Sequence, residues 1–160
     1  MNADDTSPSF LPTVQVVQLR FEQQSEALGI GVARPRLSWI SKTAADNWRQ
    51  AACEIEATFA ETTPNATTLV TGRVASDESV LVDWPFAPLT ARARARVRVR
   101  VWGEDGSQSS WSEPAWVEAG LFDGADWPAR SITPDWDEDL ASPQPAPLLR
   151  SEFVLTGEVK

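Results

Sequence analysis

The chain has 160 residues, a formal net charge of −9 at pH 7 and a hydrophobic fraction of 42%. This length allows one domain with flanking segments, and the apolar content is sufficient for a buried core. The sequence has no histidine and a single cysteine, which excludes Ser-His-Asp catalysis, most zinc sites and an intrachain disulfide. The acidic balance also argues against a general attraction to nucleic acid. We therefore expect no cofactor, no bound metal and no nucleic-acid partner.

The first 13 residues mix Asp, Ser and Pro without periodicity, and they are typical of a disordered lead-in. They lack the basic and apolar regions of a signal peptide. No apolar run in the chain approaches the roughly 18 residues needed to span a membrane. The sequence alone therefore predicts a cytoplasmic protein that does not enter a membrane.

Short segments with β character follow one another from residue 14 onward. The first five predicted strands are residues 14–21, 36–40, 50–59, 69–74 and 79–84. The pattern places Leu37 and Trp39 on one side of the second strand, and Cys53, Ile55, Ala57 and Phe59 on one side of the third. We interpret the glycine-spaced stretch 27–33 as an apolar loop.

The stretch from Ala91 to Trp102 has arginine at every even position from Arg92 to Arg100, and Ala or Val at the odd positions between them. A period of two places the arginines on one side of a long β-strand and the aliphatic residues on the other. The strand leads into Asp105-Gly106, a strong hairpin signal, and residues 113–120 form the last strand. Seven short strands without an amphipathic helix predict an all-β fold, a fibronectin type III or immunoglobulin-like β-sandwich over residues 14–121.

Two interpretations of the arginine row can be compared. Arg92 to Arg100 could bind phosphate or an acidic polymer, or they could form a solvated sheet face that neighbouring carboxylates neutralise. In a seven-strand sandwich the third strand usually lies beside the sixth, so Glu54 and Glu56 are expected to face arginines there. The net charge of −9 favours this second interpretation.

Tryptophan is abundant, with eight residues in the chain. Indole rings could serve as platforms that stack on sugars, or they could belong to the core and its covering. We predict that Trp39 is a buried anchor of the second strand. For Trp102, Trp111 and Trp116 both roles stay open, either covering the edges of the sandwich or making carbohydrate or interdomain contacts.

The composition changes after Leu121. Residues 122–147 are rich in Pro and Asp and are predicted to be a linker, and residues 148–160 resume β character as the start of a following β domain. The acidic cluster within the linker does not have the spacing of a calcium loop, and a proline-flanked linker is a poor scaffold for a pair of hydrolytic carboxylates; its members are Asp135, Asp137, Glu138 and Asp139. Asn65 matches a glycosylation acceptor, which we attribute to chance.

Several short motifs together resemble the N-terminal fibronectin type III-like domain of bacterial α-L-rhamnosidases of glycoside hydrolase family 78. They occur in the same order as in that family: Ala27-Leu-Gly-Ile30, Arg34-Pro-Arg-Leu-Ser-Trp39, Gln50-Ala-Ala-Cys-Glu-Ile55, Ser76-Asp-Glu-Ser79, Arg98-Val-Arg-Val-Trp102 and Ser110-Trp-Ser-Glu113. The stretches 127–132 and 147–153 are similar to the passage into the next β domain. Cys53 stands where the family usually has Tyr, which implies local repacking.

The resemblance implies a non-catalytic accessory module whose partners are later domains of the same parent chain, and possibly carbohydrate. The parent would be a glycosidase that inverts the anomeric centre as it hydrolyses terminal α-L-rhamnose. The family's catalytic carboxylates lie far downstream, and no residue of this chain matches them. No catalytic residue is therefore carried over.

Overall fold

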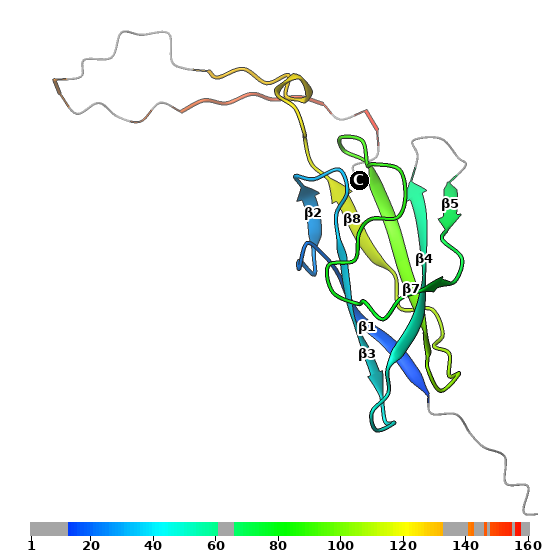
Figure 1. Ribbon diagram of the computed structural model, residues 1–160. Coiled ribbons are helices and arrows are strands. Elements are labelled where there is room, and N and C mark those ends of the chain that lie inside the picture. Colours follow the sequence, from blue (N-terminus) through cyan, green and yellow to red (C-terminus); the bar gives the residue numbers. More distant parts are fainter. Residues whose placement is uncertain are drawn as a thin grey trace, which may run out of the picture. The chain divides into compact units, whose positions relative to one another are not determined.

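The computed structural model describes residues 13–60, 66–132, 141–142, 146, 148–154 and 156–157. These residues contain eight β-strands and one short 3-10 helix, and all of them except β6 and η1 are labelled in Figure 1: β1 (Val14–Phe21), β2 (Ala27–Ile30), β3 (Leu37–Thr43), β4 (Gln50–Ala60), β5 (Thr67–Val70), β6 (Val74–Ala75), β7 (Arg94–Gly103), β8 (Ala115–Ala119) and η1 (Gly124–Asp126).

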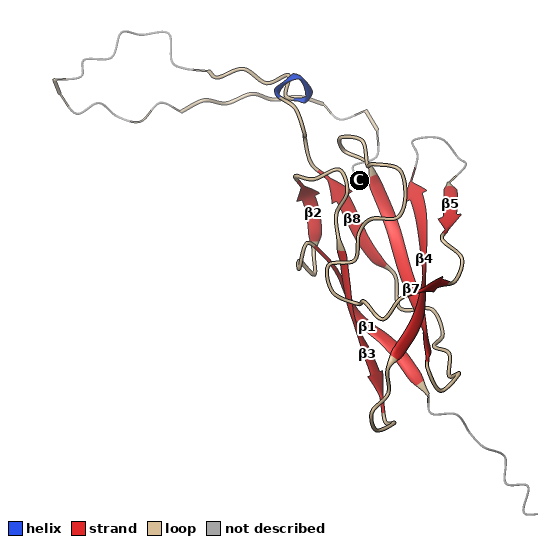
Figure 2. Ribbon diagram, viewed as in Figure 1, coloured by secondary structure: helices blue, strands red, loops and turns tan. Residues whose placement is uncertain are grey.

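The strands form two sheets of unequal size (Figure 2). The smaller sheet pairs β1 with β3, and the larger has the order β2-β8-β7-β4-β5, with β6 also pairing with β4. All pairs in the larger sheet are antiparallel except β2 with β8, which is parallel. The predicted all-β immunoglobulin-like sandwich is confirmed.

The core lies between the two sheets. It is built from the residues at alternate positions of the strands whose side chains face inward. On β7, Ala95, Val97, Val99 and Val101 are all completely buried, and the arginines between them point outward. The predicted inward side of β4 is confirmed for Cys53, Ile55 and Ala57, which are buried. Burial raises the pKa of the Cys53 thiol.

Trp39 is a buried core residue, as the sequence predicted. It is 3% exposed, and its indole Nε1 donates a hydrogen bond of 3.1 Å to Oε1 of Gln50. The Gln50 amide in turn donates to the carbonyl oxygens of Ser76 and Glu78, at 3.1 and 2.8 Å. The one polar atom of the indole is therefore satisfied within the core.

The predicted loop at residues 27–33 is wrong for its first half, because residues 27–30 form β2. Ala27 and Ile30 are buried and lie beside Val117 and Ala119 of β8. Between them Gly29 adopts a φ of +66°, and the register shifts. A glycine in this conformation interrupts the alternation of a strand, so the sequence pattern looked like a loop.

The two shorter strands predicted between residues 69 and 84 also differ from the structure. Gly72, with a φ of +70°, divides the first of them into β5 and β6. The stretch 79–84 is not a continuous strand, although one isolated bridge joins Val82 to Leu37 of β3. Leu81 has a φ of +53°, which breaks the extended backbone there.

The chain divides into two compact units, Met1–Trp127 and Pro128–Lys160. The lead-in up to residue 12, Asn65, and the acidic cluster at residues 135–139 lie outside the described residues. In the described part of the chain, no helix has the length and apolar character needed to cross a membrane.

We expect acid to weaken the link between the β1–β2 turn and the start of β3. Arg36 donates to both carboxylate oxygens of Glu22, at 3.1 and 2.7 Å, and its backbone N–H donates to the same carboxylate at 2.8 Å. These bonds lower the pKa of Glu22. Their contribution to stability is therefore complete above the usual glutamate pKa of about 4.3, and it is lost as the pH falls through the lower pKa of the folded state.

Urea unfolding at several pH values, compared with the same series for Glu22→Gln, measures this contribution. Because the pair is partly exposed, we expect a difference of about 0.5–1 kcal/mol at neutral pH that vanishes at low pH. A difference that stays constant below pH 4 would show that the carboxylate charge is not responsible.

Candidate functional site: an arginine–tryptophan ladder

The outer face of the larger sheet carries a continuous set of arginine, tryptophan and glutamate side chains. Four arginines come from alternate positions of β7 and a fifth from the β5–β6 connection. Two glutamates come from β4 and a third from β8, and the tryptophans come from β7, β8 and the segment that joins these two strands. We call this set the arginine–tryptophan ladder: Glu54, Glu56, Arg73, Arg94, Arg96, Arg98, Arg100, Trp102, Trp111, Trp116 and Glu118.

The register between β4 and β7 places Glu54 opposite Arg100 and Glu56 opposite Arg98. Arg98 donates to both oxygens of Glu56, at 2.7 and 3.0 Å, and Arg100 Nε donates to Glu54 Oε2 at 2.5 Å. The bond to Glu56 raises the pKa of Arg98. The predicted neutralisation by Glu54 and Glu56 is confirmed for Arg100 and Arg98. The prediction was wrong for Arg92, which lies before β7 with a φ of +62° and donates to the carbonyl oxygen of Asp126 at 2.8 Å.

Tryptophan rings lie against three of the guanidinium groups of β7. The Cζ atom of Arg94 lies 4.2 Å from the ring centroid of Trp116, and those of Arg98 and Arg100 lie 5.0 and 4.6 Å from that of Trp111. The Cζ atoms of Arg100 and Arg73 lie 5.1 and 4.9 Å from the ring centroid of Trp102. Such cation–π contacts contribute about 0.5–1 kcal/mol each where they are exposed.

Serine hydroxyls hold the segment that carries Trp111 against β7. The backbone N–H of Val101 donates to Ser109 Oγ at 2.9 Å, and that of Val99 donates to Ser112 Oγ at 3.0 Å. The N–H groups of the two serines donate back to the same β7 residues, at 2.9 and 2.8 Å. The two serine hydroxyls thus accept the N–H groups of β7 that a regular neighbouring strand would otherwise bind. Trp111 lies between the two serines in sequence.

The three tryptophans singled out in the sequence differ in exposure. Trp102 is 9% exposed, Trp111 is half-buried, and Trp116 is 41% exposed. Each has a guanidinium group over its ring, so a sugar stacking on that ring face would have to displace an arginine. The ladder also includes Arg73 and Glu118, which sequence reasoning did not identify; Arg94 and Glu118 lie 4.0 Å apart.

Comparison with known proteins identifies the sandwich that carries this ladder. The family model described as the Rha78A-like, N-terminal immunoglobulin domain matches residues 16–123. The chain belongs to this family. The resemblance inferred from the short motifs is therefore confirmed for the domain that they span.

The rhamnosidase N-terminal immunoglobulin domain has relatives with both sequences and solved structures. An "Alpha-L-rhamnosidase" of Streptomyces avermitilis is 39% identical over 123 residues, which are 76% of this chain and 11% of the relative. The native rhamnosidase structure from Aspergillus terreus is 38% identical with a TM-score of 0.62, covering 72% of this chain and 13% of that one. The S. avermitilis enzyme complexed with L-rhamnose is 36% identical with a TM-score of 0.65, covering 72% and 11%.

The chain thus spans only about a tenth to an eighth of the length of these rhamnosidases. It is a small immunoglobulin-like domain of a family of glycoside hydrolases, and it forms part of much longer chains in its relatives. The ladder lies within this immunoglobulin-like domain.

Proposed function

We propose that this chain is the non-catalytic N-terminal accessory module of an α-L-rhamnosidase, and that its main role is to pack against later domains of the same parent chain. The observation that carries the proposal is the match to the N-terminal immunoglobulin domain over residues 16–123, together with the small share of each relative that the chain covers. The parent would hydrolyse terminal α-L-rhamnose with carboxylates located in later domains.

The ladder supports a structural role over direct carbohydrate binding. Sugar platforms need a free aromatic face, whereas Trp102, Trp111 and Trp116 each stack on at least one arginine of the same domain. Arg94, Arg98 and Arg100, in turn, are held by Glu54, Glu56 or these rings. This arrangement also argues against a nucleic-acid partner, because it leaves few guanidinium groups free for phosphates.

The second unit supports the interdomain part of the proposal. Leu148, Leu149, Phe153 and Val154 are 97%, 55%, 79% and 87% exposed. Burying a large apolar side chain stabilises a protein by about 1.5–3 kcal/mol relative to leaving it in water. Contact of these side chains with another protein surface would therefore be favourable. We propose that residues 122–147 act as a linker and that residues 148–160 begin the following β domain of the parent.

Turnover and binding assays on the purified chain test this function. We expect no release of rhamnose from an aryl rhamnoside, and no change in tryptophan fluorescence with L-rhamnose at millimolar concentration. Trp116→Ala, which removes the most exposed ring of the ladder, serves as the control for any fluorescence change. Rhamnose release that is abolished by substituting a residue of this chain would contradict the proposal, and saturable quenching lost in Trp116→Ala would favour a carbohydrate-binding module.

A further inference from the structure

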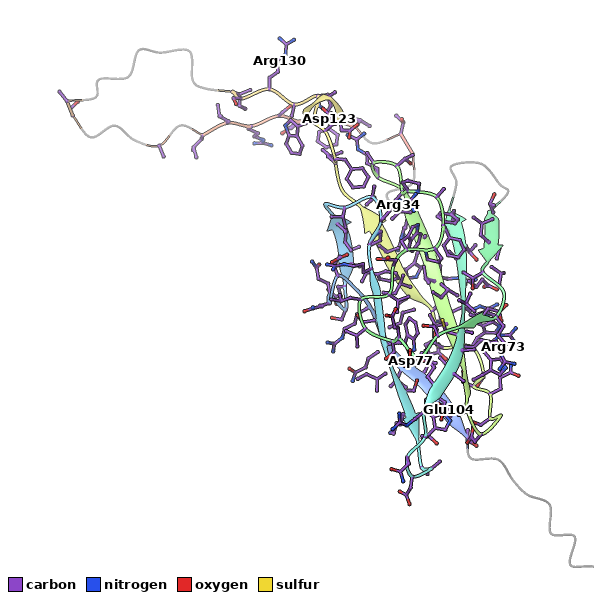
Figure 3. The ribbon with its side chains drawn as sticks, in the orientation of Figure 1. Arg34, Arg73, Asp77, Glu104, Asp123 and Arg130 are labelled. Carbon is purple, nitrogen blue, oxygen red and sulfur yellow. The ribbon has the colours of Figure 1, made fainter. Side chains whose placement is uncertain are left out.

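A hollow opens at the edge of the sandwich that is remote from β2. It has a volume of about 590 Å³ and lies between the β4–β6 pair and the segment that crosses from β6 towards β3. Figure 3 shows Asp77 on this crossing segment and Arg73 at the outer edge of the sheet. The hollow is lined by Cys53, Ile55, Thr71, Val74, Ala75, Ser76, Glu78, Leu81, Val82, Asp83, Trp84 and Pro85.

The floor of the hollow is apolar, and most polar groups in its wall are already bonded. Cys53, Ile55 and Trp84 belong to the buried core. Thr71 Oγ1 accepts from the Ile55 N–H and donates to the Gly72 carbonyl oxygen, at 3.0 and 2.7 Å. Ser76 Oγ accepts from the Glu78 N–H at 3.1 Å. A neutral polar ligand would therefore find few free partners there.

Two carboxylates at the rim are the exception. Glu78 and Asp83 are exposed, and neither forms a salt bridge among the described residues. No lysine or arginine is found among the described residues that line the hollow. The nearby Arg36 is held chiefly by Glu22 at 2.7 Å; Glu22 and, to a smaller extent, the charge of Asp83 raise the pKa of Arg36. Arg73 stacks on Trp102. An apolar floor with an acidic rim attracts a group that is both apolar and positively charged.

Leu81 in the wall has a backbone conformation that is unfavourable for leucine. Its φ is +53°, and its N–H donates to Ser38 Oγ at 2.9 Å. A bulky residue is strained in the left-handed region and is rarely found there. Leu81 therefore interrupts the extended backbone of the crossing segment where this segment lines the hollow.

We propose that this hollow binds an extended peptide segment that carries a lysine or arginine next to an apolar side chain. The apolar side chain would contact the exposed side chain of Val74 beside the apolar floor, and the cation would lie between Glu78 and Asp83. Outside its pairing with β4, the two-residue strand β6 has no strand neighbour among the described residues, so the peptide could also pair with its backbone. The volume lies within the range of about 300–1,000 Å³ typical of ligand sites. The inference does not depend on the proposed accessory role.

Three matched peptides test the charge preference: acetyl-Val-Lys-Val-amide, acetyl-Val-Gln-Val-amide and acetyl-Val-Glu-Val-amide. Each is titrated into the isotope-labelled chain while the amide resonances of Thr71, Ala75 and Ser76 are followed by NMR. We expect a dissociation constant about three- to tenfold lower for the lysine peptide than for the glutamine peptide, and the weakest binding for the glutamate peptide.

The variant Glu78→Gln/Asp83→Asn should bind the lysine and glutamine peptides equally. Glu26→Gln, which removes a carboxylate from the exposed turn between β1 and β2, is the control and should retain the preference. Equal binding of all three peptides, resonance shifts confined to other surfaces, or no shift at about 10 mM peptide would each overturn the proposal. Since no rhamnoside is used, these outcomes are separate from the test of the accessory function.

Discussion

Replacing Trp39 with alanine is expected to lower the free energy of unfolding by about 3–5 kcal/mol, the range for removing a large aromatic residue from a core. The side chain is 3% exposed and contacts the interior of the sandwich from β3. Its loss leaves a cavity and also removes the donor to Gln50 Oε1, which is itself buried. Since small domains are stable by only about 5–15 kcal/mol, this variant should lose a large part of the domain's stability.

Urea unfolding followed by circular dichroism measures the effect. Trp127→Ala is the matched control, because this indole is 63% exposed and should cost less than about 0.5 kcal/mol. Trp39→Phe keeps most of the apolar volume but loses the hydrogen bond, and should fall between the two. A loss below about 1 kcal/mol for Trp39→Ala would show that β3 does not contribute its indole to the core.

The arginine strand could be predicted because its alternation is unbroken from Arg94 to Val101. Ala95 to Val101 face inward and Arg94 to Arg100 face outward, as a period of two requires. The pairing of β4 with β7 followed from the usual order of strands in such a sandwich. It placed Glu54 and Glu56 beside the correct strand, and thereby predicted the neutralised face.

The remainder of the site depends on contacts that are distant in sequence. Arg73 reaches Trp102 from the β5–β6 connection, and Trp111 reaches β7 from a segment outside any strand. No periodic pattern marks such residues. Ser109 and Ser112 bond to β7 through their hydroxyl groups, but serines are common in turns and loops and do not by themselves predict such bonds.

The strand β2 was missed and a strand at residues 79–84 was wrongly predicted for a similar reason. β2 consists of four residues interrupted by Gly29, so its two buried positions gave too short a pattern to identify. The stretch 79–84 has apolar residues suited to a strand, yet Leu81 turns away from the extended conformation. Both differences arise because tertiary contacts, and not local propensity, decided the backbone.

Replacing Glu54 with alanine is expected to be the most damaging change within the ladder, with a loss of about 2–3 kcal/mol. Glu54 is 7% exposed, and its carboxylate accepts the 2.5 Å bond from Arg100, whose side chain is 30% exposed. Removing the carboxylate leaves a partly desolvated guanidinium without its anionic partner. Breaking a fully buried pair costs about 3–5 kcal/mol, and the partial exposure of Arg100 reduces this figure.

Glu118→Ala is the control within the same ladder, because Glu118 and Arg94 are both about half exposed and lie 4.0 Å apart. We expect it to cost no more than about 0.5 kcal/mol. The double variant Glu54→Ala/Arg100→Met should recover part of the loss, since it removes the unpaired charge and keeps an apolar stem against Trp111 and Trp102. If Glu54→Ala and Glu118→Ala cost the same in urea unfolding, the ladder would be a solvated surface feature. A large difference that the double variant relieves would instead show that the ladder's stability comes from its buried end, where Arg100 contacts Glu54 and both tryptophan rings.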